Sequence, residues 1–152
     1  MPNPDAIALL EQDHKKVKKL LTQLEETTER AAKSRTELLE EIVMELKAHT
    51  AIEEQVFYPA FKQEADEEGK QLVAESLQEH QRVKDLIEEL RELDVDDETF
   101  DVRFHELMEN VEHHVEEEES EMLPEAEMVL AEQAEELMED MQEVKRQLLS
   151  RQ

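Results

Sequence analysis

The feature that most constrains this chain is an internal repeat in which polar residues recur at matched spacing. Residues 49–59 and 114–124 each carry His, then Glu four residues later, then Pro ten residues after the His. The repeat extends upstream, because residues 13–24 match residues 79–90, each with His in second place and aliphatic residues at equal intervals. The chain is therefore two copies of one unit. The repeated polar residues are His14, His49, Glu53, His80, His114 and Glu118.

Composition predicts an all-α fold. The 152 residues include one Gly, four Pro and no Cys, and the commonest residues are strong helix formers such as Leu, Glu and Ala. A chain of this length is expected to form one domain over residues 1–152. Because the helix-breaking residues stand far apart, long helices are expected between them.

Start and stop signals give the boundaries of these helices. Asn3 and Pro4 are typical of a helix start, and residues 34–37 (Ser-Arg-Thr-Glu) have the spacing of a capping box for a second helix. Pro59 is expected to stop or kink that helix. Gly69 is expected to separate a short helical piece from the third helix.

The acidic connection at residues 93–97 predicts a cap for a fourth helix that runs from about residue 97 to Leu123. Pro124 then opens a last helix that ends near Ser150. Short links between long helices make neighbouring helices antiparallel. The sequence therefore predicts an up-down-up-down four-helix bundle over about residues 4–123, with an additional C-terminal helix over about residues 125–150.

Helical periodicity places the repeated polar residues on the buried side of the bundle. Residues at steps of three and four form one row along each core helix, which is the spacing of a buried face. A carboxylate in such a row needs a partner, because an unpaired buried charge costs several kcal/mol. The rows are Leu10, His14, Val17, Leu21 and Leu24; Leu39, Ile42, Leu46, His49, Glu53 and Val56; Val73, Leu77, His80, Val83, Ile87 and Leu90; and Phe100, Phe104, Leu107, Val111, His114, Glu118 and Met122.

Imidazoles and carboxylates gathered in one layer of a core indicate a metal centre. A single His-x-x-x-Glu pair is weak evidence, because 43 of the 152 residues are acidic and such a pair is often structural or exposed. Recurrence of the pair in buried rows favours the metal site. Six ligands exceed the four of a closed zinc site and suit two ions that share Glu53 and Glu118. His105 and His113 lie beside the rows and are expected to be exposed or to contact the ligands from outside.

Ligand type alone leaves iron, manganese and zinc open. A ferritin-like centre is disfavoured, since it needs Glu-x-x-His on two helices and only residues 11–14 fit.

The net charge of −26 repels phosphate backbones and anionic lipids, so neither nucleic acid nor a membrane is expected as a partner. The first ten residues lack the pattern of a signal peptide and no run approaches membrane-spanning length, so a cytoplasmic location is expected.

At these residues the chain resembles the hemerythrin-like family, the HHE cation-binding domains. The family pattern of His, His-x-x-x-Glu, His and His-x-x-x-Glu covers about residues 10–124. The resemblance implies a four-helix bundle that holds two iron ions in a non-haem, oxo- or hydroxo-bridged di-iron centre. It also implies small-molecule partners, because family members bind dioxygen, react with hydrogen peroxide or nitric oxide, or sense oxygen and iron. The matching ligand positions are His14, His49, Glu53, His80, His114 and Glu118.

The chain departs from the oxygen-storage hemerythrins at one ligand position. Those proteins carry a further His one turn after the third-helix ligand, and this chain has Lys84 there. The departure puts plain reversible oxygen carriage in doubt. Tyr58, the only tyrosine, is a candidate for the missing ligand. Ideal helix phase points Tyr58 to the opposite face from His49, so it would reach the site only if Pro59 distorts the helix; otherwise it is an aromatic of the core or rim.

Three functions remain open on the sequence. The first is a redox protein that binds dioxygen or decomposes peroxide in a catalase-like reaction, as a monomer or a weak homodimer. The second is a sensor or regulatory module whose metal loading controls stability and whose last helix reports it. The third is an acidic structural protein without metal, which would be equally stable before and after chelation. The apolar stripe of the last helix, from Ala134 to Leu148, is expected to pack along the bundle, with a dimer contact or the docking of a partner as the alternatives.

Overall fold

The computed structural model describes residues 6–28 and 31–150. Within these residues the chain is helical and has no strand, which confirms the all-α fold. The elements are α1 (Ala6–Glu25), α2 (Ala32–Ile52), η1 (Glu53–Phe57), α3 (Tyr58–Glu64), α4 (Glu67–Glu92), α5 (Glu98–Glu117), η2 (Glu118–Met122), α6 (Leu123–Val129), η3 (Ala131–Gln133) and α7 (Ala134–Ser150). The turns η1 and η2 are π-helical and η3 is a 3₁₀ turn.

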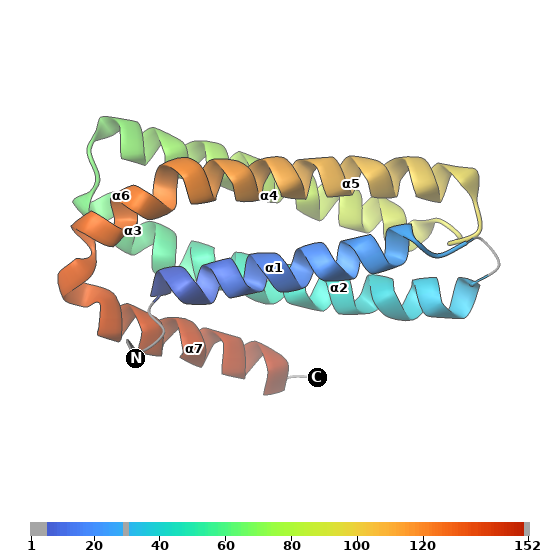
Figure 1. Ribbon diagram of the computed structural model, residues 1–152, viewed down its shortest axis with the longest axis horizontal. Coiled ribbons are helices and arrows are strands. Elements are labelled where there is room, and N and C mark those ends of the chain that lie inside the picture. Colours follow the sequence, from blue (N-terminus) through green and yellow to red (C-terminus); the bar gives the residue numbers. More distant parts are fainter. Residues whose placement is uncertain (1–5, 29–30, 151–152) are drawn as a thin grey trace.

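These elements form four long rods and one outer helix (Figure 1). The first rod is α1, the second runs through α2, η1 and α3, the third is α4, and the fourth runs through α5, η2 and α6. Successive rods are antiparallel, and α1 packs beside α2 while α4 packs beside α5. The helix α7 returns along the outside of α1 and α2. The up-down-up-down bundle with an additional C-terminal helix is therefore confirmed.

Two π-helical turns lie at matched places in the repeat, directly after His-x-x-x-Glu. In η1 the backbone N–H of Tyr58 donates to the carbonyl of Glu53, five residues back. In η2 the N–H of Leu123 donates to the carbonyl of Glu118 in the same way. A proline follows each turn and has no N–H to donate, so the wider turn lets the helix continue where an α-helix would clash or break. Pro59 and Pro124 therefore redirect the rods and do not end them.

The aspartate caps of α4 and α5 position the third and fourth rods. Asp66 accepts a hydrogen bond from the backbone N–H of Gly69, and Asp97 accepts one from that of Thr99. Gly69 lies inside α4, so the prediction that it separates two helices is wrong. A Cβ at this position would lie 2.6 Å from the Cβ of Ala65, and the glycine thus permits the tight approach of α3 and α4.

The start of α2 also differs from the sequence prediction. The helix begins at Ala32, and Ala31 caps it without a side-chain hydrogen bond, so the predicted capping box at residues 34–37 is wrong. Alanine and lysine favour helix, and the helix extends through them past Ser34. The buried Arg35 holds this end of the bundle, because its guanidinium donates to the carbonyl of Val95 at 2.6 Å. The predicted start signals Asn3 and Pro4 lie outside the described residues.

The last helix begins later than predicted. Helical structure continues past Pro124 to Val129, and the chain turns at Leu130, whose φ of −108° and ψ of 10° lie outside the α region. The helix α7 starts only at Ala134. Its predicted range of about 125–150 therefore covers most of α6, the turn η3 and the helix α7.

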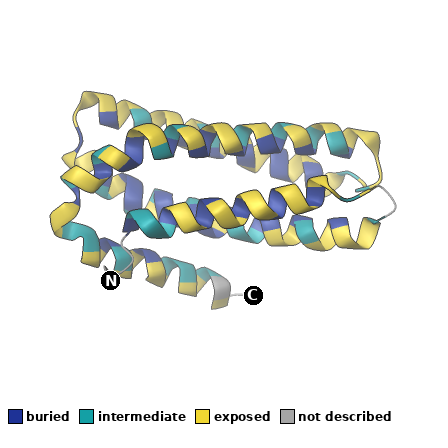
Figure 2. Cartoon of the chain, in the orientation of Figure 1, coloured by how far each residue is buried: buried dark blue, intermediate teal, exposed yellow. Residues whose placement is uncertain are grey.

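The buried residues of the rods face one another (Figure 2), and they form two apolar clusters with a layer of buried polar residues between them. One cluster joins α1, α2, α4 and α5, and the other joins the ends of these rods with α3, α6 and α7. The predicted rows are mostly buried, with one clear exception. Leu77 is 42% exposed, while Ser76 beside it is buried, because the row on α4 steps from Val73 to Ser76 before it reaches His80. The polar layer is where the repeated His and Glu residues lie.

Candidate metal centre

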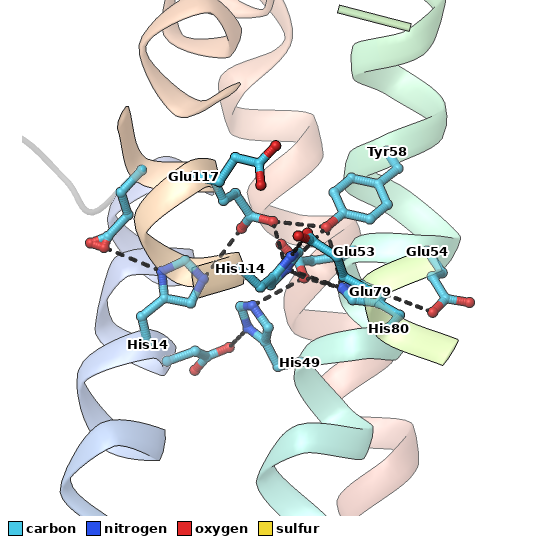
Figure 3. Close-up of polar contacts among 12 residues, drawn as sticks. His14, His49, Glu53, Glu54, Tyr58, Glu79, His80, His114 and Glu117 are labelled. Carbon is cyan, nitrogen blue, oxygen red and sulfur yellow. Dashed lines mark hydrogen bonds and ion pairs between the residues drawn. The ribbon is translucent and has the colours of Figure 1, made fainter. Parts of the chain in front are cut away.

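Six buried side chains from four rods meet in the polar layer (Figure 3). None of them is more than 7% exposed. The layer is polar where a helical core is usually apolar, and the sequence repeat supplies one imidazole and one His-Glu pair from each half. His14 comes from α1, His49 and Glu53 from the junction of α2 and η1, His80 from α4, and His114 and Glu118 from the junction of α5 and η2.

The six side chains form two overlapping groups. Within each group, the atoms that could bind a metal all lie within 4.8 Å of one another. Glu53 belongs to both groups, so one carboxylate faces both sets of imidazoles. The first group is His14, His49, Glu53 and Glu118, and the second is Glu53, His80 and His114.

Both carboxylates span the two halves of the repeat. Glu53 Oε1 lies 3.2 Å from His49 Nε2 in its own half and 3.0 Å from His80 Nε2 in the other half. Glu118 is placed in the same way, with Oε2 at 3.1 Å from His114 Nε2 and Oε1 at 3.3 Å from His14 Nε2. Each carboxylate could therefore join two cations, which is the arrangement expected from the ligand count.

Each of the four imidazoles turns its Nε2 atom inward and its Nδ1 atom toward an outer carboxylate. An acid on the far nitrogen fixes the ring orientation and strengthens the inner nitrogen as a ligand, and this pairing is typical of metal-binding histidines. The contacts from Nδ1 are His14 to Glu119 at 3.4 Å, His49 to Asp13 at 3.1 Å, His80 to Glu54 at 2.8 Å and His114 to Glu79 at 2.8 Å.

The outer acids obey the same twofold pattern as the inner ligands. Asp13 and Glu79 each precede the first His of a half and hold the second His of that half. Glu54 and Glu119 each follow the inner Glu and hold the first His of the other half. Sequence reasoning missed these four residues, although all of them lie at matched positions of the repeat. In a chain with 43 acidic residues, an acid beside a histidine carries little information by itself.

Tyr58 points into the site, and this settles the orientation that the sequence left open. Its hydroxyl donates to Glu118 Oε2 at 2.7 Å and lies 3.3 Å from His80 Nε2 and 3.5 Å from His114 Nε2. The turn η1 explains the difference from ideal helix phase, because a π-helical turn holds more residues than an α-helical one. In the other half the equivalent residue is Leu123, so the two halves differ here.

Protonation of the metal-free site reflects its buried charges. Burial alone would lower the pKa of His49, but the charge of Glu53 and the hydrogen bond with Asp13 raise it to about 10. Burial likewise opposes charge on His114, but hydrogen bonds with Glu118, Glu53 and Glu79 raise its pKa to about 12. Burial and the nearby carboxylates raise the pKa of Tyr58 well above its ordinary value. Protons thus do part of the charge balancing that a cation would do.

Hydrogen bonding within the described residues leaves several inner atoms unsatisfied. Five buried atoms have no hydrogen-bond partner among these residues, namely His14 Nδ1 and Nε2, His49 Nε2, Glu53 Oε2 and Glu118 Oε1. Buried polar atoms are normally satisfied, so atoms that converge without partners need a ligand. Imidazole nitrogen and carboxylate oxygen suit a divalent first-row metal. The residues present therefore fit a bound metal.

The remaining sequence candidates lie outside the layer. His105 and His113 are exposed, as predicted, and His113 contacts Glu79 and Glu117 at the surface. Lys84 also points outward, with its Nζ 3.3 Å from Glu54 Oε2. It thus supports the outer acid of His80 and does not enter the position of a missing ligand.

Comparison with known proteins agrees with this geometry. A family model described as the hemerythrin HHE cation binding domain matches residues 5–126. The chain belongs to the hemerythrin HHE cation-binding family. This hemerythrin-like chain therefore has the cation-binding role of its family, and its buried His and Glu cluster could hold the metal. The resemblance inferred from the repeat is confirmed.

Two relatives agree with the family match. An uncharacterized hemerythrin-like protein of Schizosaccharomyces pombe is 34% identical over 93 residues, which cover 61% of this chain and 46% of that protein. The match thus spans less than half of the relative's length. A crystal structure of a hemerythrin HHE cation binding domain-containing protein from Mycobacterium kansasii has a TM-score of 0.82 at 26% identity, covering 95% of this chain and 86% of that one. Among the described residues of this hemerythrin-like chain, no helix is both apolar enough and long enough to cross a membrane.

Proposed function

We propose that this protein holds two iron ions in the polar layer and uses them to bind or transform a small oxygen- or nitrogen-containing molecule. One observation carries the proposal: four imidazole Nε2 atoms converge on two buried carboxylates, while an outer acid lies within 3.4 Å of each Nδ1 atom. A structural salt-bridge network would not need all four rings to turn the same nitrogen inward. In a metal centre each imidazole presents one nitrogen to the metal and gives the other to a hydrogen-bond partner, and this is the pattern that the four rings share.

The residues divide between two ions. His14 and His49 serve one position, and His80 and His114 serve the other. Glu53 and Glu118 each contact imidazoles of both halves and are the bridging groups of the proposal. Tyr58 lies beside the second position only, where it is a seventh ligand or a hydrogen-bond donor to Glu118.

The substrate is expected to be small and uncharged. A cavity of about 30 Å³ adjoins the site, and the imidazoles form one of its walls. Its other walls are mainly aliphatic, with Val17, Leu46, Val83, Val111 and Val115 facing it. Because about 10–15 Å³ of such volume holds one water molecule, the cavity has room for a molecule of about two heavy atoms, such as dioxygen, nitric oxide or hydrogen peroxide. Iron in such a site supplies the redox and small-molecule binding chemistry.

The chain's own residues set the conditions for that chemistry. The aliphatic walls exclude bulk water from the imidazole side of the centre. The outer acids hold the imidazoles in position, and the Tyr58 hydroxyl offers a proton 2.7 Å from Glu118. Dioxygen binding and catalase-like peroxide decomposition are the leading activities of the proposal.

A second candidate function is a sensor whose metal loading changes the stability of the bundle. One contact favours it: Lys145 on α7 reaches Asp13, which in turn holds His49. Strong stabilisation by iron together with negligible peroxide turnover would support the sensor. Turnover or oxygen-dependent spectral change would support the redox protein.

Iron content tests the proposed centre directly. The purified wild-type protein should contain about two iron ions per chain, in accordance with its six ligands. His49→Ala should lose them, while His105→Ala, which removes an exposed histidine paired with Glu25, should keep them. Equal iron content in His49→Ala and wild type would overturn the proposal. Peroxide turnover and oxygen-binding spectra of the loaded protein then separate the two leading activities.

A further inference from the structure

Among the described residues, one ion pair to a buried carboxylate links the last helix to the proposed centre. Lys145 on α7 lies with its Nζ 3.2 Å from Asp13 Oδ1, and the other oxygen of Asp13 lies 3.1 Å from His49 Nδ1. Asp13 is only 5% exposed, and Lys145 follows it by 132 residues. A chain of contacts thus runs from the outer helix to an inner imidazole.

This support differs in kind from that of the other imidazoles. Glu54, which holds His80, is supported by Lys84 from the same helix as His80. Glu79, which holds His114, has His113 beside it, and His113 directly precedes His114 on the same helix. Among the ion pairs of the described residues, only Asp13, which holds His49, is contacted by a cation from outside the four core rods. No described helix takes the equivalent place of α7 against the second half of the repeat.

Apolar packing places Lys145 where it can make this contact. Leu137 and Met141 are buried in the same cluster as Phe57 and Tyr58, so one face of α7 is fixed against the bundle. Lys145 lies one turn after Met141 on that face. Arg146, the next residue, instead pairs with Glu143 of its own helix. The position of Lys145 therefore follows from how α7 docks.

We propose that Lys145 is a positioning residue for His49, acting through Asp13, so that docking of α7 and metal binding stabilise each other. The inference rests on the proposed metal centre and adds α7 to it. With Lys145 in place, one oxygen of Asp13 is held by the ammonium group and the other contacts His49 Nδ1, so that His49 Nε2 is aimed inward. Because coupling between two sites is reciprocal, a metal that orders His49 must tighten α7 by the same factor as α7 tightens metal binding.

Hydrogen exchange of α7 with and without metal measures this coupling. Ferrous iron is added anaerobically to the metal-free full chain, and exchange is compared for the amides of α7 and of the core rods. In the wild type, loading should slow exchange in α7 about tenfold, within the usual range of coupling between sites. In Lys145→Met the core should still respond, while α7 changes less than about twofold and iron affinity falls about tenfold. Lys145→Arg should restore both responses.

Two control variants test whether the effect belongs to the contact of Lys145 with Asp13 or follows from the loss of any nearby cation. Arg146→Met removes the adjacent cation, which pairs only within α7 among the described ion pairs, and should leave the coupling unchanged. Lys84→Met removes the support of Glu54 and should weaken iron binding without abolishing the response of α7. If the amides of α7 exchange fully in metal-free Lys145→Met, the helix has undocked in that variant. The test then rests on Lys145→Arg. If α7 docks again in Lys145→Arg but its exchange does not slow on metal binding, the inference is overturned.

The outcomes distinguish this inference from the proposed function. A wild-type chain that binds no iron overturns the metal centre and the coupling together. A wild-type chain that binds iron while α7 exchange stays constant overturns the coupling alone. Equal slowing of α7 in wild type and Lys145→Met also overturns it, because the helix would then respond without Lys145.

Discussion

The two halves of the repeat agree closely at the centre of the site and differ at its edge. Both supply a His, a His-x-x-x-Glu, an outer acid for every imidazole, and a π-helical turn before proline. They differ in Tyr58, which is matched by Leu123, and in the cation that α7 brings to Asp13. The comparison teaches that a repeated spacing determines the geometry of the inner His and Glu residues, while single residues outside this set make the two halves of the site unequal.

The backbone cannot be the source of that inequality. The N–H of Tyr58 and the N–H of Leu123 make the same bond to the carbonyl of an inner glutamate five residues back. Both positions are buried and both point toward the bundle interior. The difference is therefore chemical, since one half presents a hydroxyl where the other presents only hydrocarbon.

Removal of an inner carboxylate should have the largest effect and tests whether the halves are equivalent. Glu53→Gln and Glu118→Gln each take a charge from a residue that contacts imidazoles of both halves. Each change should lower iron affinity by more than about 100-fold, since loss of an outer partner alone costs 10- to 100-fold. Iron content after dialysis against a chelator measures the effect. Glu116→Gln, an exposed residue of the same acidic run, is the control.

Equal losses in the two variants would confirm that both carboxylates bridge. Complete loss in one and retention of a single ion in the other would show that only one carboxylate bridges. Retention of both ions in either variant would contradict the assignment of that residue as a ligand.

In the metal-free protein the two halves should hold their imidazole protons up to different pH values, because the pKa of His49 is about 10 and that of His114 is about 12. Both values exceed the ordinary value, so the charged imidazoles stabilise the metal-free fold fully below the unfolded pKa of 6.5. The contribution of His49 is then lost as pH rises toward about 10, and that of His114 toward about 12. The melting temperature of the metal-free protein should therefore fall from about pH 7 to about pH 10, as thermal unfolding would show.

Metal uptake should show the opposite dependence on pH. A metal must displace the protons of both imidazoles, so its affinity should rise by about tenfold per proton for each pH unit in this range. Calorimetry in buffers of different ionisation enthalpy would count the protons released. Uptake without proton release would mean that His49 and His114 are neutral before the metal binds.

Loss of an outer acid should lower metal affinity less than loss of an inner carboxylate. It also provides a second comparison of the two halves. Asp13→Asn and Glu79→Gln remove equivalent carboxylates, which hold His49 and His114. Each should lower metal affinity by about 10- to 100-fold through loss of ring orientation. Only Asp13→Asn should also loosen α7, because only Asp13 contacts Lys145. Metal titration and hydrogen exchange of the pair measure the two effects, and equal loosening of α7 in both would contradict the asymmetry.

How far the sequence could predict this site depends on how far ideal periodicity holds. Steps of three and four placed all six inner residues in the buried layer, and their role as ligands stays a prediction. Past Glu53 the steps of three and four no longer predict burial correctly. They predict a buried Val56, whereas Phe57 is fully buried and Val56 only partly. Pro59 hinted at a distortion, but a π-helical turn depends on how the rod packs as a whole. The contact of Lys145 with Asp13 had no local signal, because it joins residues from opposite ends of the chain.

The smallest expected effect comes from Tyr58→Phe, which makes the two halves alike in lacking a hydroxyl at this position. The variant should still bind iron, because the Leu123 half has no hydroxyl here and six other ligands remain. Loss of the hydrogen bond to Glu118 should destabilise the metal-free protein by about 1 kcal/mol, as chemical denaturation would show. If Tyr58 ligates, the ferric protein should have a tyrosinate-to-iron band in the visible that the variant lacks. Tyr58 is the only tyrosine, so such a band has one source. An unchanged visible spectrum in the variant would exclude ligation and leave Tyr58 as a hydrogen-bond donor to Glu118, so that the two halves would differ here in a hydrogen bond and not in a ligand.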